Sequence, residues 1–345
     1  MPLIKNKACY NRMAKNLFIL FFVLVLTLYA VNYCFSSSQC VARSQLSSRS
    51  FYLFVGSPIH CIIYLDASEG RLGNHMFMVA SAYGLARLHG CRLYLTPAAI
   101  HQFGNYFELN FSNILLSQTE FKSLQVSINN QSKFDSFNQY VACSYMKNVT
   151  VPKLFLEKRI MRLLGYWQSY LYFDKYREEI CEDIFVARSS VLEKVAAFFE
   201  ETYRMKMDFA SKLSRNNSRV LKSQLKTLDN LTWIGIHIRR TDFIELGYAS
   251  SSTYLFKAME YYIKIYHDAY FIVASDDKLF CESLFHSHSS IRITPKSFSP
   301  QLDLITLSMC EHSIITSGTF SWWSGFLANG LILYDDVYKS GCKNS

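Results

Sequence analysis

The C-terminal third of this 345-residue chain alternates short apolar runs with stretches of helical periodicity, and this alternation restricts the fold more than any other feature. The apolar runs are rich in β-branched and aromatic residues and predict strands, whereas the stretches between them predict helices. Strands that alternate with helices form a parallel sheet, because each connection crosses over a face of that sheet. The predicted strands are 232–238, 270–277, 291–294, 313–318 and 331–334, and the predicted helices are 251–267, 278–287, 303–312 and 321–330.

The N-terminal part of the folded chain shows the same pattern once more. "CIIYLDAS" (61–68) and "CRLYL" (91–95) predict strands, and "HMFMVASAYGLARLHG" (75–90) has the spacing of a helix that ends at a glycine. Together with the glycine turn "GRLGN" (70–74), these segments predict a βαβ unit and therefore a second parallel sheet. A further helix is predicted at 189–205.

Two less regular segments separate these patterns. Residues 101–153 show no firm periodicity, and 163–180 predicts the end of a strand followed by the start of a helix. Residues 211–230 are polar, so we place the boundary between two halves there. The prediction is an α/β protein with an N-terminal half at 59–215 and a C-terminal half at 216–345.

Polar side chains stand where several predicted strands of the C-terminal half end. Ligands of such sheets bind beyond the carboxyl ends of the strands, so these side chains are expected at a ligand site. "HIRRTDF" (237–243) places two permanent cations and a carboxylate directly after a buried strand. The strand-end residues are His237, Arg239, Arg240, Asp276, Asp277, Ser317 and Thr319.

The two adjacent arginines are expected to face different ways. A planar guanidinium offers paired donors that match two oxygens of a phosphate, so one arginine would bind an anionic ligand. The other would pair with Asp242 or a second carboxylate and hold the turn. The alternative is a surface salt bridge, which the position after an apolar strand disfavours.

The segment "SGTFSWW" (317–323) follows a predicted strand and opens a predicted helix. Small residues there let backbone N–H groups approach an anion, and the helix N-terminus favours negative charge. Simple N-capping by Ser or Thr is the alternative, and both interpretations can hold. The pair Trp322–Trp323 is more typical of a core than of a sugar-binding platform. At "ASDD", at least one of Asp276 and Asp277 is expected to cap a helix rather than bind a ribose.

Several nucleotide-binding and metal-binding patterns are absent from the sequence. "GRLGN" lacks the full G-x-G-x-x-G pattern, and no P-loop pattern occurs. No Asp-x-Asp occurs either, although many luminal glycosyltransferases hold a divalent metal with such a pair. Arginine and helix N-termini could neutralise a departing pyrophosphate instead, so no metal is expected.

Taken in order, "GRLGN", "GYWQS", "HIRRTDF", "FIVASDD" and "TSGTFSWW" resemble the α1,2-fucosyltransferase family, across roughly residues 62–333. These are GDP-fucose-dependent Golgi enzymes with a type II membrane topology. Two motifs depart from the family, which commonly has Gly-Asp-Tyr where this chain has Thr241-Asp242-Phe243, and Gly-Asn-Gln where it has Gly73-Asn74-His75. The departures leave the use of the donor intact and concern the acceptor.

The resemblance implies a GT-B arrangement of two Rossmann-like halves and an inverting reaction that needs no metal and no cofactor besides the donor. The C-terminal half would hold GDP-fucose, and the N-terminal half would help to shape the acceptor site. Arg239 would bind the β-phosphate, which leaves Arg240 to hold the turn through Asp242, and His237 and Asp303 would face guanine. The remaining implied site residues are Ser317, Gly318, Thr319, Phe320 and Ser321 along the pyrophosphate, and Gly70, Arg71, Gly73 and Asn74 in the glycine turn.

The expected reaction moves L-fucose to a hydroxyl of a glycan, most simply the 2-hydroxyl of a terminal galactoside. Asp242 and Glu245 are the nearby carboxylates, and either could deprotonate the acceptor. One alternative is transfer to a core glycan or to protein hydroxyls. Another is a non-catalytic luminal lectin, which would not need His237, Arg239 and Asp303.

The N-terminus predicts a membrane anchor. Residues 17–35 carry no charge and would form a helix roughly 28 Å long, about the thickness of a bilayer core. Four basic residues and no acidic residue precede this run, which predicts a cytoplasmic N-terminus at 1–16 and translocation of the rest. A cleaved signal peptide is the alternative, but its apolar region would be shorter. Serine-rich residues 36–58 are expected to form a stem.

The remainder has the features of a luminal glycoprotein. Eight of the ten cysteines follow the predicted anchor, none of them in a Cys-x-x-Cys pair, so some are expected to form disulfides in an oxidising lumen. The formal net charge of the whole chain is +9, and the predicted tail holds four of its cations, so the remainder carries about 9 − 4 = 5 positive charges. This mildly basic balance suits an anionic ligand, and without a long basic run no nucleic acid is expected. The expected partners are GDP-fucose, a glycan acceptor, the Golgi membrane and, as a candidate, a second copy of the chain. Glycosylation is expected at the five Asn-x-Ser/Thr sequons, Asn110, Asn130, Asn148, Asn216 and Asn230.

Overall fold

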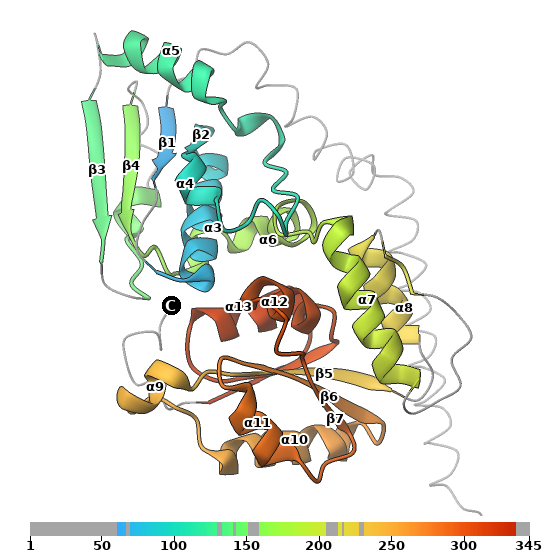
Figure 1. The fold of residues 1–345 in the computed structure, drawn as a ribbon. Coiled ribbons are helices and arrows are strands. Elements are labelled where there is room, and N and C mark those ends of the chain that lie inside the picture. The colour runs from blue at the N-terminus through green and yellow to red at the C-terminus, as the bar shows by residue number, and fades with distance from the viewer. Residues whose placement is uncertain are drawn as a thin grey trace, which may run out of the picture. The chain divides into compact units, whose positions relative to one another are not determined.

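A computed structural model (Figure 1) describes residues 61–66, 70–129, 133–140, 143–150, 159–204, 213–215, 217–227 and 231–335. These residues belong to one compact unit, Ile59–Ser345. The predicted tail, transmembrane helix and stem lie outside the described residues, as do Asn130, Asn216 and Asn230. No helix within the described ranges is long and apolar enough to cross a membrane.

The N-terminal part contains the second parallel sheet that the sequence predicts. Its strand order is β2-β1-β4-β3, and every pair is parallel. The long helix α3 (Leu72–His89) joins β1 to β2 and ends at Gly90, which takes the left-handed conformation at φ 67°. The predicted βαβ unit is therefore confirmed. The strands are β1 (Cys61–Leu65), β2 (Arg92–Leu95), β3 (Lys133–Gln139) and β4 (Arg159–Gly165).

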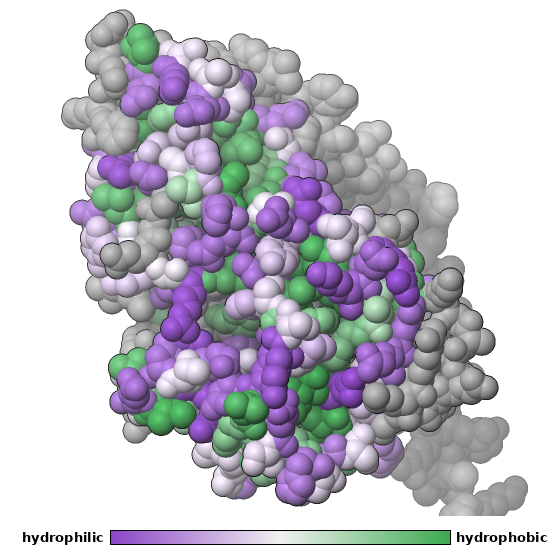
Figure 2. All heavy atoms as spheres, viewed as in Figure 1, coloured by the Kyte–Doolittle hydropathy of each residue, from purple (hydrophilic) through white to green (hydrophobic). Residues whose placement is uncertain are grey.

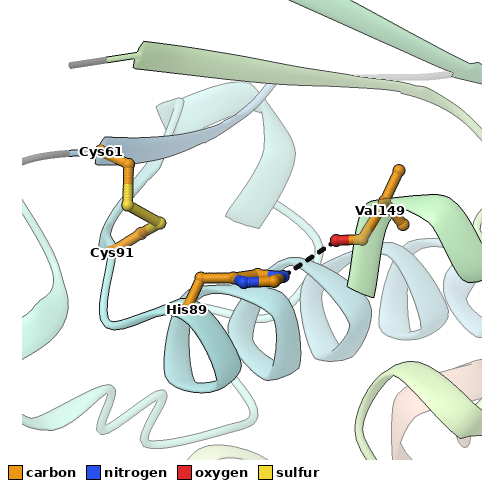
Figure 3. The surroundings of a disulfide bond; sticks show 4 residues. All are labelled: Cys61, His89, Cys91 and Val149. Atoms are coloured by element: carbon orange, nitrogen blue, oxygen red, sulfur yellow. Dashed lines mark hydrogen bonds between the residues drawn. A yellow bond between two sulfur atoms is a disulfide. The ribbon is translucent and has the colours of Figure 1, made fainter. Parts of the chain in front are cut away.

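A disulfide joins the start of β1 to the turn after α3. Cys61 and Cys91 are bonded, as Figure 3 shows, and both are buried. His89 in the last turn of α3 points toward Val149, and its Nε2 lies 2.8 Å from the Val149 carbonyl oxygen. Cys143 is also disulfide-bonded, whereas Cys181, Cys281 and Cys310 carry free thiols.

The C-terminal part contains the five-stranded sheet that the alternation predicts. Its order is β7-β6-β5-β8-β9, again with parallel pairs throughout. Helices α10 and α11 lie along one face of this sheet, and α12 and α13 lie along the other (Figure 1). The strands are β5 (Thr232–Ile238), β6 (Ala269–Ser275), β7 (Ile291–Ile293), β8 (His312–Ile315) and β9 (Ile332–Tyr334), and the helices are α10 (Ser252–Ile265), α11 (Lys278–Phe285), α12 (Pro300–Ser308) and α13 (Thr319–Ala328).

Strand β5 divides its side chains between these two faces. Ile234, Ile236 and Ile238 join the buried cluster that includes side chains of α10. Gly235 lies against Leu307 of α12, because a Cβ added there would be 3.3 Å from that side chain. Successive strand residues alternate in direction, so His237 faces the same side as α12 and α13.

The less regular segments contain elements that the sequence pattern did not reveal. The region 101–153 holds α5 (Gln118–Asn129) and β3, and the polar segment 211–230 holds the helix α8 (Ser218–Thr227). Helix α8 is recognisable only by Leu221 and Leu225, which are fully buried four residues apart on one face. After β4 and a short loop, the chain forms successive short turns rather than one helix: η4 (Tyr170–Tyr172), η5 (Asp174–Tyr176), α6 (Arg177–Glu179) and η6 (Ile180–Ile184).

An aromatic core packs α13 against α3 and these short turns. Trp323 is completely buried, and its ring stacks on Phe173 at 5.6 Å and meets Phe77 at 5.2 Å. The expectation that the tryptophan pair belongs to the core is confirmed for Trp323. Trp322 is partly buried and packs on Phe326 at 4.7 Å.

Gly84 in the middle of α3 lets the turns approach this helix. A Cβ at residue 84 would lie 2.2 Å from the Tyr172 carbonyl oxygen, so Gly84→Ala must displace backbone. We expect this substitution to lower the free energy of unfolding by about 2 to 3 kcal/mol, measured by urea unfolding. Gly104→Ala is the matched control, because no atom lies within 4 Å of a Cβ there. Equal stability of the two variants would contradict this packing.

Candidate functional site

The residues predicted from the strand ends gather at the carboxyl edge of the C-terminal sheet. The chain runs outward from β5 through β6 to β7 on one side and from β8 to β9 on the other. The region beyond the carboxyl ends of β5 and β8, named the crevice here, is therefore the switch point at which α/β sheets bind ligands. The backbone N–H of Arg239, after β5, donates to Oγ1 of Thr316, after β8, at 2.9 Å. This bond joins the two edges of the crevice.

Arg239 is held between two carboxylates. Its Nη2 lies 2.5 Å from Asp242 Oδ1, and its Nη1 lies 2.5 Å from Asp276 Oδ2. The guanidinium also lies over the ring of Phe243, at 5.4 Å from the centroid. The side chain is only 15% exposed, so it is not a surface salt bridge. Two ion pairs and an aromatic ring therefore restrain its position.

Arg240 faces different partners, as expected, but the predicted pairing with Asp242 is wrong. Its Nε pairs with Asp277 at 3.2 Å, and its guanidinium stacks on Phe280 at 3.4 Å. The short helix α9 (Thr241–Glu245) turns the chain back directly after the arginines and brings Asp242 to Arg239, three residues earlier. The alternative expectation, that Arg240 pairs with a second carboxylate, is confirmed by Asp277.

The two aspartates after β6 have separate structural tasks. Asp276 accepts the backbone N–H of Arg240 at 2.9 Å and the hydroxyl of Thr241 at 2.6 Å, in addition to its ion pair with Arg239. Asp277 caps α11, because its Oδ1 accepts the backbone N–H of Phe280 at 3.1 Å. The expectation that at least one of the pair caps a helix is confirmed.

The N-terminus of α13 forms the opposite wall of the crevice. Gly318 precedes the helix at φ 106°, a conformation that favours glycine, and no side chain caps this end. The first intrahelical bond runs from the Trp322 N–H to the Gly318 carbonyl, so the N–H groups of Thr319, Phe320 and Ser321 have no intrahelical acceptor. Ser317 Oγ is buried and has no hydrogen-bond partner among the described residues. Simple N-capping is thus not the function of "SGTFSWW".

The glycine turn of the N-terminal part packs directly onto this helix end. A Cβ at Gly73 would lie 2.6 Å from the backbone N of Phe320, so only glycine permits the approach. Trp323 Nε1 donates to the Gly73 carbonyl at 3.1 Å. Asn74 Oδ1 accepts from Thr319 Oγ1 at 2.7 Å and from Gln168 Nε2 at 2.9 Å. Three segments far apart in sequence therefore meet at one point.

Arg71 adds a second guanidinium to the crevice. It precedes α3, and its Nη2 lies 3.4 Å from Asp242 Oδ2. Asp242 is thus bracketed by Arg71 and Arg239. Although partial desolvation raises the pKa of Asp242, the hydrogen bond and charge of Arg239 and the charge of Arg71 lower it below its ordinary value.

His237 lies behind the crevice as a neutral group. It is 5% exposed, its Nδ1 lies 2.5 Å from Ser321 Oγ, and its ring packs on Phe320 at 4.3 Å. Burial, with a smaller effect of the charge of Arg239, lowers the pKa of His237 to about 3 against the raising effect of Asp276. The imidazole therefore carries no charge at neutral pH.

Asp303 lies in the first turn of α12 and is also buried, with 6% exposure. Lys278, which follows Asp277, bonds to Asp303 Oδ1 at 3.0 Å and to the Pro295 carbonyl at 2.7 Å. Asp303 is connected to the strand edge through Lys278. Burial raises the pKa of Asp303 to about 6, against the lowering effects of Thr294 and Lys278.

The two candidate bases differ in position. Asp242 lies inside the arginine network, whereas Glu245 at the end of α9 is exposed and forms no ion pair with the described residues. Its neighbours Ile244 and Leu246 are 49% and 59% exposed. Figure 2 shows apolar (green) surface at the lower left, where α9 lies in Figure 1. The structure brings Asp242 to the site and does not bring Glu245 there.

Sequence reasoning missed Thr316 and Gln168. Both lie inside quoted motifs, "TSGTFSWW" and "GYWQS", yet nothing local distinguishes them from their neighbours. Their partners, Arg239 and Asn74, are 77 and 94 residues away in the chain. Each bond joins residues of the same part of the molecule, and only the folding of that part brings the partners together.

These features define an α/β protein with a cluster of arginine and carboxylate side chains at the carboxyl edge of a parallel sheet. A family model, Glycosyl transferase family 11, matches residues 63–334. The chain belongs to glycosyl transferase family 11.

The galactoside 2-alpha-L-fucosyltransferase SEC1 of Bos taurus is 24% identical over 281 residues, which are 79% of this chain and 66% of that protein. The Sec1 enzyme of Mus musculus is 26% identical over 276 residues, 77% of this chain and 64% of that protein. The chain thus spans slightly less than two thirds of each. Among solved structures, POFUT1 in complex with GDP has a similar fold, with a TM-score of 0.51 and 10% identity over 81% of this chain and 100% of that chain.

The raised pKa of Asp303 predicts a pH dependence of stability. Between pH 4 and 6 the folded protein retains a proton that the unfolded chain releases, so the contribution of Asp303 to stability falls as pH rises through this window. Asp303→Asn does not titrate. We expect the unfolding free energy of the wild type, relative to this variant, to fall by roughly 3 kcal/mol from pH 3.5 to pH 7. Parallel stability curves for the two proteins would show that Asp303 titrates normally.

Proposed function

We propose that this protein is an inverting fucosyltransferase that moves L-fucose from GDP-fucose to the 2-hydroxyl of a terminal galactoside. The observation that carries the proposal is Arg239, a largely buried guanidinium at the end of β5 and beside the open N-terminus of α13. Membership of glycosyl transferase family 11 supports transfer of a sugar. The choice of donor sugar and acceptor is supported by the relatives, which are named galactoside 2-alpha-L-fucosyltransferases.

The first chemical requirement is stabilisation of the departing GDP. Negative charge builds on its β-phosphate as the bond to fucose breaks, so groups that bind this charge more strongly in the transition state accelerate the reaction. Arg239 offers two parallel donors, and the N–H groups at the start of α13 add a favourable field. Asp242 and Asp276 hold Arg239 in place without ligand, and an entering phosphate would share or replace one of these carboxylates.

The second requirement is removal of the proton from the acceptor hydroxyl. Arg239 and Arg71 lower the basicity of Asp242 in the ligand-free protein. A diphosphate that binds these arginines would release Asp242 from them and restore its basicity. Glu245, at the exposed end of α9, is the other candidate. Comparison of kcat for Asp242→Asn and Glu245→Gln distinguishes these two candidates.

The donor base is assigned to the buried side of the crevice. Neutral His237 and the largely buried Asp303 are the proposed contacts to guanine, because a dry site favours hydrogen bonds to a neutral ring. Asn74, placed by Thr319 and Gln168, stands where the glycine turn meets α13. We assign the N-terminal part to the acceptor side of a GT-B arrangement.

We further propose that residues 17–35 anchor the chain in the Golgi membrane and that the described part is luminal. The Cys61–Cys91 disulfide is typical of an oxidising compartment, and Asn110 and Asn148 are exposed, as glycosylated residues must be. Protease added to sealed microsomes should leave a C-terminal tag intact. Digestion of the tag without detergent would refute this topology.

The acceptor is tested by incubating the detergent-solubilised full chain with labelled GDP-fucose and a glycan array. Label on terminal galactosides, with the linkage assigned to the 2-hydroxyl, supports the proposal. Label confined to core glycans or protein hydroxyls would establish a different acceptor. Binding of glycans without any transfer would identify a lectin.

Substitution of each arginine by lysine tests their separate assignments. Lysine keeps the charge but loses the paired donors, so Arg239→Lys should fold and lose roughly a hundredfold in kcat/KM, on the order of 3 kcal/mol. Arg240 acts on the turn through Asp277 and Phe280, so Arg240→Lys should lower the melting temperature more than the turnover of folded protein. Wild-type turnover of Arg239→Lys with an inactive, stable Arg240→Lys would reverse the two assignments.

We expect the transfer to proceed without a divalent metal, because two guanidinium groups and a helix N-terminus stand where the pyrophosphate would bind. Transfer rates should be unchanged within about twofold when EDTA is added to metal-free buffer. Activity that EDTA abolishes and manganese restores would place a metal at the pyrophosphate.

A further inference from the structure

The C-terminal end of α13, opposite the crevice, is held by two cations from other elements. Lys222 Nζ of α8 donates to the carbonyl of Leu327 at 3.0 Å and to that of Ala328 at 2.7 Å. Arg177 Nη2 of α6 donates to the carbonyl of Phe326 at 3.0 Å and to Asn329 Oδ1 at 3.1 Å. Three consecutive carbonyls that a helix leaves without intrahelical partners are therefore satisfied by side chains.

These contacts are placed in a packed environment rather than at a mobile surface. The guanidinium of Arg177 stacks on the ring of Phe326, 3.9 Å from its centroid. Lys222 is half-buried, and desolvation lowers its pKa to about 8. Asn329 takes the left-handed conformation after the helix and donates its N–H to Gly325, so this end already has an ordinary backbone cap. The two cations add a second set of restraints to a helix that is already terminated.

The other end of the same helix packs against the glycine turn. The Gly73 backbone touches Phe320, and Trp323 and Thr319 bond to Gly73 and Asn74. Helix α13 is ten residues long, roughly 15 Å, so its two ends move together as one rigid rod. A shift at the cationic end would be transmitted to the N–H groups at the crevice.

We propose that Lys222 and Arg177 are positioning residues of the donor site. They hold α13 so that the unpaired N–H groups at its N-terminus are placed to bind the diphosphate. This inference rests on the proposed function, because it assigns the diphosphate of the donor to that helix end. Cations also stabilise the negative end of a helix, which favours the same arrangement. Neither residue touches the crevice itself.

The test compares the affinity for GDP, which contains the diphosphate, with the affinity for guanosine. Lys222→Met removes the cation but keeps an unbranched apolar chain. In the full chain in detergent, GDP affinity should fall about tenfold, because misplaced donors lose the diphosphate. Guanosine affinity should change less than twofold, because guanosine lacks the phosphates. Titration calorimetry with GDP and with guanosine measures both, and Lys222→Arg should restore the affinity for GDP.

Arg219→Met is the matched control on the same helix. Arg219 is 64% exposed and pairs with Glu182 at 2.6 Å, away from α13, so its loss should leave GDP affinity unchanged. If Lys222→Met does not fold, Arg177→Gln removes the other cation at this end of α13. It should lower the affinity for GDP and leave the affinity for guanosine nearly unchanged.

Three outcomes would overturn the inference. Unchanged GDP affinity in a folded Lys222→Met or Arg177→Gln protein would show that the contacts only stabilise the fold. Equal weakening of GDP and guanosine would show general loosening rather than positioning of the phosphate end. A wild-type protein that binds no GDP would refute the proposed function as well as this inference, and that result is seen without any variant.

Discussion

The close contact between Gly73 and the N-terminus of α13 is the constraint on which the candidate site depends. It brings a turn that belongs to one parallel sheet against a helix that belongs to the other, with no space for a single methyl group. Packing at this distance lets Trp323 and Thr319 bond across the junction, and it brings Arg71 to the same carboxylate as Arg239. Residues from both sheets therefore meet at the crevice.

The electrostatics of this crevice centre on one guanidinium that two carboxylates pair. Asp242 and Asp276 satisfy the guanidinium of Arg239, so a buried cation is never left unpaired. The diphosphate of the proposed donor would compete with these carboxylates, and it has the charge and the paired oxygens to do so. His237, kept neutral by burial, adds no charge that would repel or attract the ligand.

Helix α13 takes part both in the close packing at Gly73 and in the electrostatics of the crevice. Its N-terminus is open toward the crevice, whereas its C-terminal carbonyls meet Lys222 and Arg177. Apolar packing of Trp323 on Phe173 and Phe77 holds its middle. A helix dipole stabilises a bound charge only when the helix stays close to that charge. Here the aromatic packing and the two cations hold the helix in place.

The sequence by itself determined both parallel sheets and the strand-end position of His237, Arg239 and Ser317. It also indicated that the two adjacent arginines have different partners. Periodicity and chain order are local properties, so they can be read without the tertiary structure. It did not determine that Asp242 pairs with Arg239, that Cys61 bonds to Cys91, or that the polar segment 211–230 contains α8. It gave no sign that Lys222 meets the end of α13, 106 residues further along the chain. Such pairings depend on which surfaces meet after folding, because side chains of the same type compete for each partner until packing excludes all but one.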